Sequence, residues 1–184
     1  GLVFLFVVIL DFGMEMYLTK EVVAARDDKE GLNLLFSFFI LIKSIGVTLS
    51  FPLLFLLIPE VELYTALLCW CLIFLMTIRP VCFYCGLELY SNQSKIEIAG
   101  KILMVFIVLL LDFEKGEINK ALEIQVVGAI FMNILFYFYL RKYCTFSFDI
   151  FSKTYLVKRY LKSSFGYYTA RLFVNIYIQS STYL

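Results

Sequence analysis

A few charged side chains stand inside long apolar stretches of this sequence, where they could bind ions or anionic ligands. Lys43 follows Leu32 by 11 residues, which places it about 16 Å into the apolar stretch 32–58 if that stretch is helical. A cation at this depth cannot easily reach water with its side chain. Lys43 should therefore either line a cavity and attract anions or pair with a buried carboxylate such as Asp11. The sequence leaves both alternatives open.

A second set of polar residues lies near the end of the chain. Arg171, Asn175 and Gln179 are spaced by four residues and share one face of a helix over 165–184. A charged side chain at membrane depth costs about 2.5 to 3.5 kcal/mol, so this face should turn toward a bundle interior or a water-filled cavity. We expect the three side chains to bind substrate there. A helix lying on the membrane surface is the alternative.

Two further cations have a structural and a functional interpretation. Lys101 follows Glu97 by four residues, a spacing at which the two charges neutralise each other on a helix, although Lys101 could also line a cavity. Arg79 precedes Pro80 near the end of the apolar stretch 63–83. There Arg79 could anchor the helix at the head groups, and Pro80 could act as a hinge.

The sequence does not favour metal, cofactor or nucleic-acid chemistry. Its five cysteines include the pair Cys82 and Cys85, but there is no His and no second pair nearby, so we expect no metal site. Lys and Arg never gather in a dense patch interleaved with aromatics, which argues against nucleic acid as a partner. No organic cofactor is indicated. Without His, catalysis would fall on carboxylates, and the link 59–62 is too short for an outer active site, so we do not expect an enzyme.

The elements that position these residues are apolar and long. The chain is 62% hydrophobic with a mean hydropathy of +0.88, above the roughly 45 to 50% apolar share of soluble domains. Unbroken apolar runs favour helices over the alternating pattern of a membrane barrel. We predict an all-α, polytopic membrane helix bundle, with residues 1–184 as a single transmembrane domain. The expected spanning helices are six, near 1–18, 32–58, 63–83, 94–111, 121–140 and 165–184.

Basic residues are distributed unevenly among the connections. Lys and Arg are frequent after the first, third and fifth predicted helices and sparse after the second and fourth. The positive-inside rule then places the first set of connections in the cytoplasm. The chain begins within one apolar run at Gly1 and ends within another at Leu184, so we expect it to be a fragment of a longer protein.

Three patches of sequence, in this order and spacing, resemble the O-antigen and polysaccharide flippases, the Wzx-like family related to the MATE transporters. Two departures from the family pattern are visible. The usual Thr-Arg-Glu is Thr-Lys-Glu at 19–21, and Cys82 stands where an aromatic residue commonly follows the proline. The patches are Asp11-Phe12-Gly13 with Thr19-Lys20-Glu21; Arg79-Pro80 with Gly86-Leu87-Glu88; and Leu161-Lys162-Ser163-Ser164-Phe165.

The resemblance implies a two-lobe transporter of which this chain is most of one lobe. Such a protein carries undecaprenyl-diphosphate-linked oligosaccharide outward across the bacterial inner membrane by alternating access, for O-antigen, capsule or exopolysaccharide synthesis, with that lipid-linked substrate and membrane lipid as its partners. Its cationic cavity would be lined by Lys43, Arg171 and Lys101 together with Asn175 and Gln179, and Asp11 would couple an ion.

Three alternatives to the flippase remain open. A MATE-type multidrug extruder would rely on membrane carboxylates rather than cations. A membrane enzyme of polyprenyl-linked sugar metabolism would need a sizeable outer loop. A scaffold or channel subunit would use its polar stripes only to hold helices together.

Overall fold

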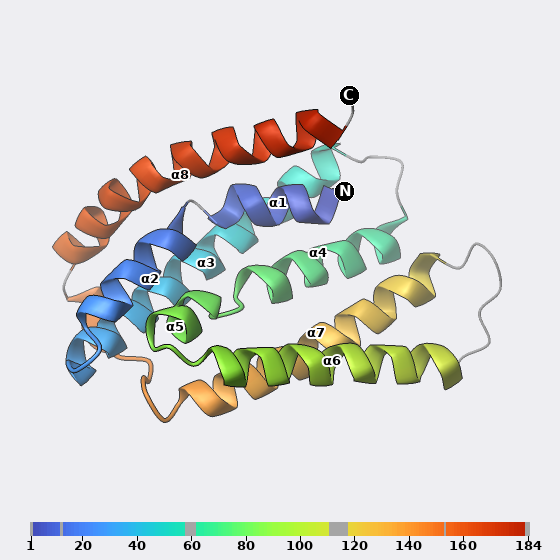
Figure 1. Cartoon of the computed structure of the whole chain (residues 1–184). Helices are drawn as coiled ribbons and strands as arrows, with labels where there is room; N and C mark the ends of the chain where they lie inside the picture. Colours follow the sequence, from blue (N-terminus) through green and yellow to red (C-terminus); the bar gives the residue numbers. More distant parts are fainter. Residues whose placement is uncertain (1, 12, 58–61, 111–117, 153, 183–184) are drawn as a thin grey trace.

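The computed structural model describes residues 2–11, 13–57, 62–110, 118–152 and 154–182, and these form helices joined by short connections, with no strand among them. The helices pack side by side into an elongated bundle (Figure 1). In chain order the elements are α1 (Leu2–Asp11), α2 (Met14–Ala24), α3 (Lys29–Leu57), α4 (Leu63–Thr77), α5 (Val81–Gly86), α6 (Tyr90–Leu110), α7 (Ile118–Leu140), the 3-10 helix η1 (Phe148–Phe151) and α8 (Thr154–Thr182).

Three of the described segments are long and apolar enough to cross a membrane: Lys29–Leu54, Leu63–Gly86 and Asn119–Leu140. The predicted class, an all-α membrane helix bundle, is therefore confirmed. Helix α6 is long enough as well, but it carries the charged residues Lys95, Glu97 and Lys101. That α6, the segment 1–18 and the segment 165–184 also span the membrane stays a prediction.

Two of the expected continuous helices are broken. The segment 1–18 is divided into α1 and α2, because Gly13 adopts the left-handed conformation with φ 67°, which helices of L-residues do not contain. The segment 63–83 is divided into α4 and α5 by Arg79 and Pro80, since proline has no N–H to continue the helix. Hydropathy alone predicts one helix in each case because both breaks lie inside apolar sequence.

The last helix is longer than the sequence predicted. It begins at Thr154 rather than near residue 165, because its first turns are too polar for a hydropathy scan to include them. Those turns contain Lys158, Arg159 and Lys162, which are good helix formers. The stretches expected at 32–58, 94–111 and 121–140 appear as α3, α6 and α7, with ends that differ by at most four residues.

Helices α6 and α7 pack closely through a reciprocal pair of small and flexible residues. A Cβ atom added to Gly100 would overlap the side chain of Met132, and one added to Gly128 would overlap that of Met104. Each glycine therefore receives a methionine from the other helix, the close approach that small residues permit in membrane bundles. Helix α7 also packs against α4, so that α7 links α6 to the centre of the bundle.

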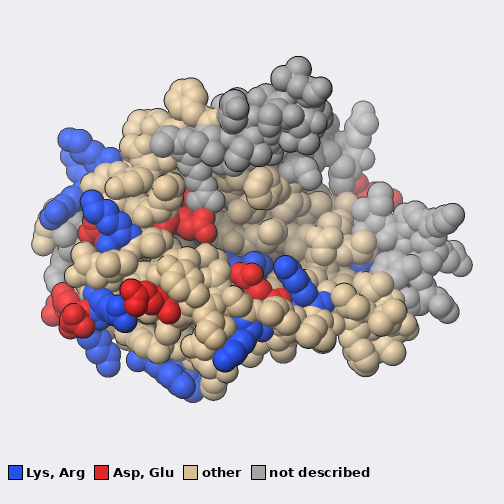
Figure 2. Space-filling model, viewed as in Figure 1, with Lys and Arg blue, Asp and Glu red and all other residues tan. Residues whose placement is uncertain are grey.

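The connections that follow α2, α5 and α7 lie at one end of the bundle, together with the start of α8 (Figure 1). Figure 2 shows Lys and Arg side chains gathered mainly at and near that end of the visible face. The fold thus brings the basic connections together at one end, as the positive-inside argument requires of a membrane protein with a cytoplasmic face.

Candidate functional site

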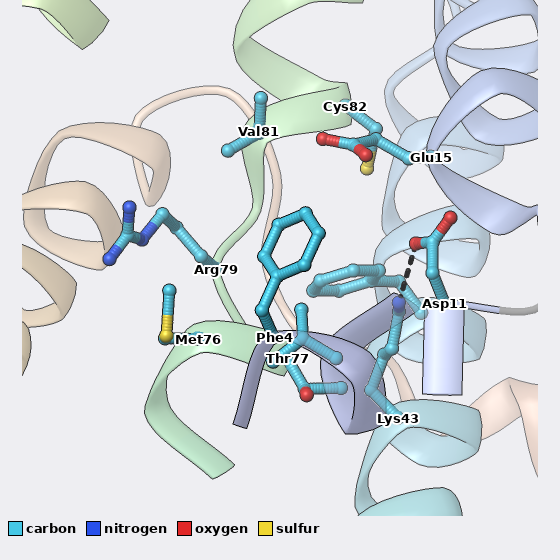
Figure 3. A pocket seen from close by; sticks show the side chains of 11 residues that line it. Phe4, Asp11, Glu15, Lys43, Met76, Thr77, Arg79, Val81 and Cys82 are labelled. Atoms are coloured by element: carbon cyan, nitrogen blue, oxygen red, sulfur yellow. Dashed lines mark hydrogen bonds and ion pairs between the residues drawn. The ribbon is translucent and has the colours of Figure 1, made fainter. Parts of the chain in front are cut away.

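A partly open pocket of about 180 Å³ lies where the two broken helices meet. Its walls come from both sides of each break and from the middle of α3 (Figure 3). Unwound helix segments at membrane depth are tolerated only inside protein or beside a water-filled cavity, which makes this junction the first candidate for a functional site. The lining residues are Phe4, Val7, Asp11, Glu15, Phe39, Lys43, Met76, Thr77, Arg79, Val81 and Cys82.

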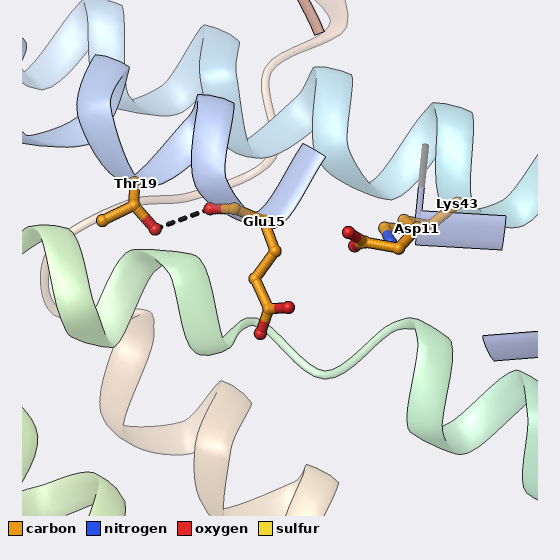
Figure 4. Close-up of polar contacts among 4 residues, drawn as sticks. All are labelled: Asp11, Glu15, Thr19 and Lys43. Atoms are coloured by element: carbon orange, nitrogen blue, oxygen red, sulfur yellow. Dashed lines mark hydrogen bonds and ion pairs between the residues drawn. The ribbon is translucent and has the colours of Figure 1, made fainter. Parts of the chain in front are cut away.

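The pocket contains a buried ion pair between Asp11 and Lys43. Lys43 Nζ donates a hydrogen bond to Asp11 Oδ1 at 2.8 Å, and the two residues are only 4% and 6% exposed (Figures 3 and 4). The two alternatives for Lys43 are therefore combined, because it pairs with Asp11 and also lines a pocket. Two charges taken out of water are costly to keep unless they are paired, so neither side chain is suited to standing alone here.

The break between α1 and α2 places two carboxylates at opposite helix ends. Asp11 is the last residue of α1, where a negative charge is disfavoured by the helix dipole, so Lys43 provides compensation that the helix itself cannot. Glu15 lies in the first turn of α2, where the dipole favours it, and it also lines the pocket. One turn further on, Thr19 Oγ1 donates to the carbonyl oxygen of Glu15 at 2.6 Å (Figure 4).

Gly13 is required at this break for two reasons. Its left-handed φ of 67° strains any residue with a Cβ. A Cβ there would also overlap the backbone of Tyr168, because α8 crosses the break at this point. The glycine thus fixes both the exit of the chain from α1 and the distance to α8.

The break between α4 and α5 is held by polar side chains of α7. The hydroxyl of Tyr137 donates to the carbonyl oxygen of Ile78 at 2.6 Å, and Asn133 Nδ2 donates to the carbonyl oxygen of Leu75 at 2.9 Å. These bonds occupy carbonyls near the end of α4, where the helix can no longer provide all the partners. Sequence reasoning missed both residues, although a buried Asn within the apolar stretch 121–140 was a usable signal.

Arg79 lies inside the bundle rather than at its end. Its Cζ is 6.0 Å from the centre of the Phe136 ring, and the side chain points away from the Asp11–Lys43 pair toward α7 (Figure 3). The interpretation of Arg79 as a head-group anchor stays a prediction. Arg79 Nε and Thr77 Oγ1 are buried without a hydrogen-bond partner among the described residues.

The charges around the pocket balance. Asp11 and Glu15 supply two carboxylates, and Lys43 and Arg79 supply two cations. The resemblance implied a cationic cavity. Among the described residues, the lining of this pocket is instead balanced in charge.

Lys101 lies elsewhere, on the outer face of α6. It is exposed and borders an open apolar groove with Ile98, Ile102, Val105, Phe106 and Leu109. The hydrogen-bond partner found for Glu97 is Gln93, whose Nε2 donates to Glu97 Oε1 at 3.1 Å. The structure therefore does not bring Lys101 into the pocket with Lys43.

The polar stripe of the last helix falls where side chains are not described. The backbone at Arg171, Asn175 and Gln179 is helical within α8, but their side chains lie outside the described part of the structure. Their role in binding substrate stays a prediction.

These features define a class: a helical membrane protein with a paired, buried charge at the junction of two interrupted helices. The sequence profile of the polysaccharide biosynthesis protein family matches residues 1–184, and the chain belongs to that family. Neither a curated protein nor a solved structure matches the chain. The family agrees with the resemblance seen in the sequence and gives the chain a role in polysaccharide biosynthesis.

Proposed function

We propose that the protein is a flippase that carries undecaprenyl-diphosphate-linked oligosaccharide outward across the bacterial inner membrane by alternating access. The observation that carries this proposal is the buried Asp11–Lys43 pair within a pocket between two interrupted helices. Ionisable residues inside membrane helices are costly and mark ion and substrate pathways. Interrupted helices near the middle of a membrane are likewise where secondary transporters bind their ligands.

The size of the pocket limits what it binds. About 180 Å³ is below the roughly 300 to 1,000 Å³ of sites for drug-sized ligands, so an oligosaccharide does not fit inside it. In our proposal the glycan passes along the surface of this chain, and the pocket changes its internal pairing as the helices move. Lys43 then offers its charge to the diphosphate in one state and pairs with Asp11 in the other.

The remaining predicted site residues complete the proposed pathway. Arg171, Asn175 and Gln179 would contact the diphosphate or the sugars, and Lys101 would add a positive charge along the outer face of α6. Asp11 would bind a coupling ion when Lys43 leaves it, because a buried carboxylate without a partner favours a cation or a proton.

A MATE-type multidrug extruder is the second candidate. The observation in its favour is that the pocket holds two carboxylates, Asp11 and Glu15, as a carrier of cationic drugs would need. Such a protein would lower the accumulation of cationic dyes in cells and leave surface glycan unchanged. A membrane enzyme of polyprenyl-linked sugar metabolism would instead alter glycan chain length.

The test uses the complete protein in cells that lack their own copy. Lys43→Gln and Asp11→Asn should each lower surface glycan per molecule of protein in the membrane, while the lipid-linked oligosaccharide accumulates on the cytoplasmic side. Arg26→Gln is the control, since Arg26 pairs with Glu88 on the surface at 3.1 Å. Normal glycan export in both pocket variants would contradict the proposed role of the pair.

A further inference from the structure

The connection between α7 and α8 is hydrogen-bonded to α3. The backbone N–H of Thr145 donates to Asn33 Oδ1 and that of Ser147 donates to Ser37 Oγ, both at 2.7 Å. Asn33 and Ser37 lie one turn apart on α3, so the connection runs along that helix. Two polar residues of α3 thus hold the connection in place.

This arrangement creates an apolar groove between α3, η1 and the first turns of α8. Its volume is about 350 Å³, and the only polar residue among those that line it is Lys158. Leu41 comes from α3, the buried Ile150 from η1, and Val157 and Leu161 from α8. Phe151, Lys158 and Leu161 are exposed, so the groove opens to the outside.

Three large aromatic side chains on η1 and the first turn of α8, two of the elements that form the groove, are exposed. Phe148 of η1 is 77% exposed, Tyr155 of α8 is 68% exposed and Phe151 is 58% exposed. Tyr is concentrated in membrane proteins at the level of the lipid head groups, and exposed Phe side chains favour contact with lipid over contact with water. The groove therefore lies where phospholipids are the surrounding medium.

The charges on α8 beside the groove are positive, and the carboxylate nearest to Ile150 in the sequence is Asp149 of η1, whose Oδ2 accepts a hydrogen bond from the Ser147 hydroxyl at 2.9 Å. The sequence contains no Asp or Glu between Ile150 and Leu184, but it contains Lys153, Lys158, Arg159, Lys162 and Arg171. Lys158 and Lys162 are four residues apart on α8 and repel each other. Among the described residues no carboxylate forms an ion pair with either of them, so an anion from outside the chain would relieve the repulsion.

We propose that this groove binds an anionic phospholipid, with an acyl chain between Leu41 and Leu161 and the head-group phosphate between Lys158 and Lys162. Charge complementarity selects the anionic lipid, and the apolar groove selects a lipid over a free phosphate. Because the groove is shared by α3, η1 and α8, the bound lipid holds the start of α8 against α3. The site is separate from the Asp11–Lys43 pocket and does not depend on which substrate is transported.

The test measures the thermal stability of the complete protein in nanodiscs of phosphatidylcholine with and without phosphatidylglycerol. We expect phosphatidylglycerol to raise the melting temperature of the wild type and of the control Lys20→Gln/Lys29→Gln, which loses the same charge at the same end of the bundle. Lys158→Gln/Lys162→Gln should lose at least half of that gain. Soluble glycerol phosphate should not reproduce it.

Cross-linking provides a measurement that needs no substitution. Phosphatidylglycerol with a photoreactive acyl chain should label the wild type at Leu41 and within residues 150–161. Unlabelled phosphatidylglycerol should reduce this labelling more than phosphatidylcholine does. Equal stabilisation of the Lys158→Gln/Lys162→Gln variant and the control, the same effect from glycerol phosphate, or labelling confined to other segments would overturn the proposal. None of these readouts involves glycan export, so their failure leaves the proposed flippase function untouched.

Discussion

Lys43 Nζ lies 2.8 Å from Asp11 Oδ1, and this contact ties the end of α1 to the middle of α3 at the place where α1 stops. The pair is buried, and it adjoins the left-handed Gly13 that separates α1 from α2. Any relative movement of α1 and α3 would have to break or exchange this contact. The pair is therefore suited to report, and to control, the position of the broken helix.

Removal of one partner should destabilise the protein more than removal of both. Asp11→Asn or Lys43→Gln alone leaves an uncompensated buried charge, which costs about 3 to 5 kcal/mol, whereas the double variant leaves none. The double-mutant cycle should therefore give a coupling free energy of about 3 to 5 kcal/mol or more. Chemical unfolding of the complete protein in detergent measures it.

The exposed pair Arg26–Glu88 provides the matched control for that cycle. Its atoms are 3.1 Å apart, but the side chains are 49% and 65% exposed, so we expect a coupling of at most about 1 kcal/mol. Equal coupling in the two cycles would mean that burial does not strengthen the Asp11–Lys43 contact.

Two glycines should respond to alanine with opposite signs. Gly13→Ala should destabilise by about 1 to 3 kcal/mol, because the residue has a positive φ and its Cβ would overlap the backbone of α8. Gly166→Ala lies within α8 with open space around the added atom, and it should stabilise by about 0.4 to 1 kcal/mol. The melting temperatures of the two variants, measured under the same conditions, test this prediction. An unchanged melting temperature for Gly13→Ala would contradict a strained backbone at the break.

The hydroxyl of Tyr137 should matter more than that of its neighbour Tyr139. Tyr137→Phe leaves the Ile78 carbonyl near the α4–α5 break without its donor, at a cost of about 1 to 3 kcal/mol. Tyr139 is exposed, and its hydroxyl makes no hydrogen bond within the described structure, so Tyr139→Phe should change stability by less than about 0.5 kcal/mol. Unfolding of the two variants under identical conditions tests this, and identical values would contradict it.

The thiol of Cys144 should be unreactive in the folded protein. Burial raises its pKa from 9.0 to about 12, so almost no thiolate forms at pH 8. The neutral thiol contributes fully to stability below pH 9, and that contribution is lost as the pH rises from about 9 toward 12, where the unfolded chain ionises first. Maleimide should label Phe148→Cys, at a position that is 77% exposed, and spare Cys144 in otherwise cysteine-free protein. Rapid labelling of Cys144 at pH 8 would contradict its burial.

The helical class and the approximate position of most helices followed from apolar length, because a membrane allows few ways of satisfying the backbone. The breaks at Gly13 and Pro80 could not be placed by the same argument. Gly and Pro are tolerated in membrane helices when neighbouring helices satisfy the freed groups. At the break before Pro80 those neighbours are Tyr137 and Asn133 of α7, which are distant from Pro80 in the sequence.

The candidate site was predictable only in part. Lys43 and Asp11 were identifiable because charges are rare in apolar runs, and their possible pairing could be stated. The inclusion of Glu15 and Thr77, and the exclusion of Lys101 from the pocket, depend on how α2, α4 and α6 rotate about their axes relative to their neighbours. Sequence periodicity gives little information on this for a helix such as α4, which is apolar on every side. The long polar start of α8 was missed because hydropathy detects membrane segments and not helices that continue beyond them.

The most direct test of the proposed function is translocation of a fluorescent lipid-linked oligosaccharide in proteoliposomes that contain the complete protein. Wild-type protein should move the lipid to the opposite leaflet faster than empty liposomes do. Lys43→Gln should slow this movement by about tenfold or more, equivalent to about 1.4 kcal/mol in the barrier, while Lys20→Gln leaves it unchanged. Translocation by Lys43→Gln at the wild-type rate, or no translocation by the wild type, would contradict a flippase that operates through the Asp11–Lys43 pocket.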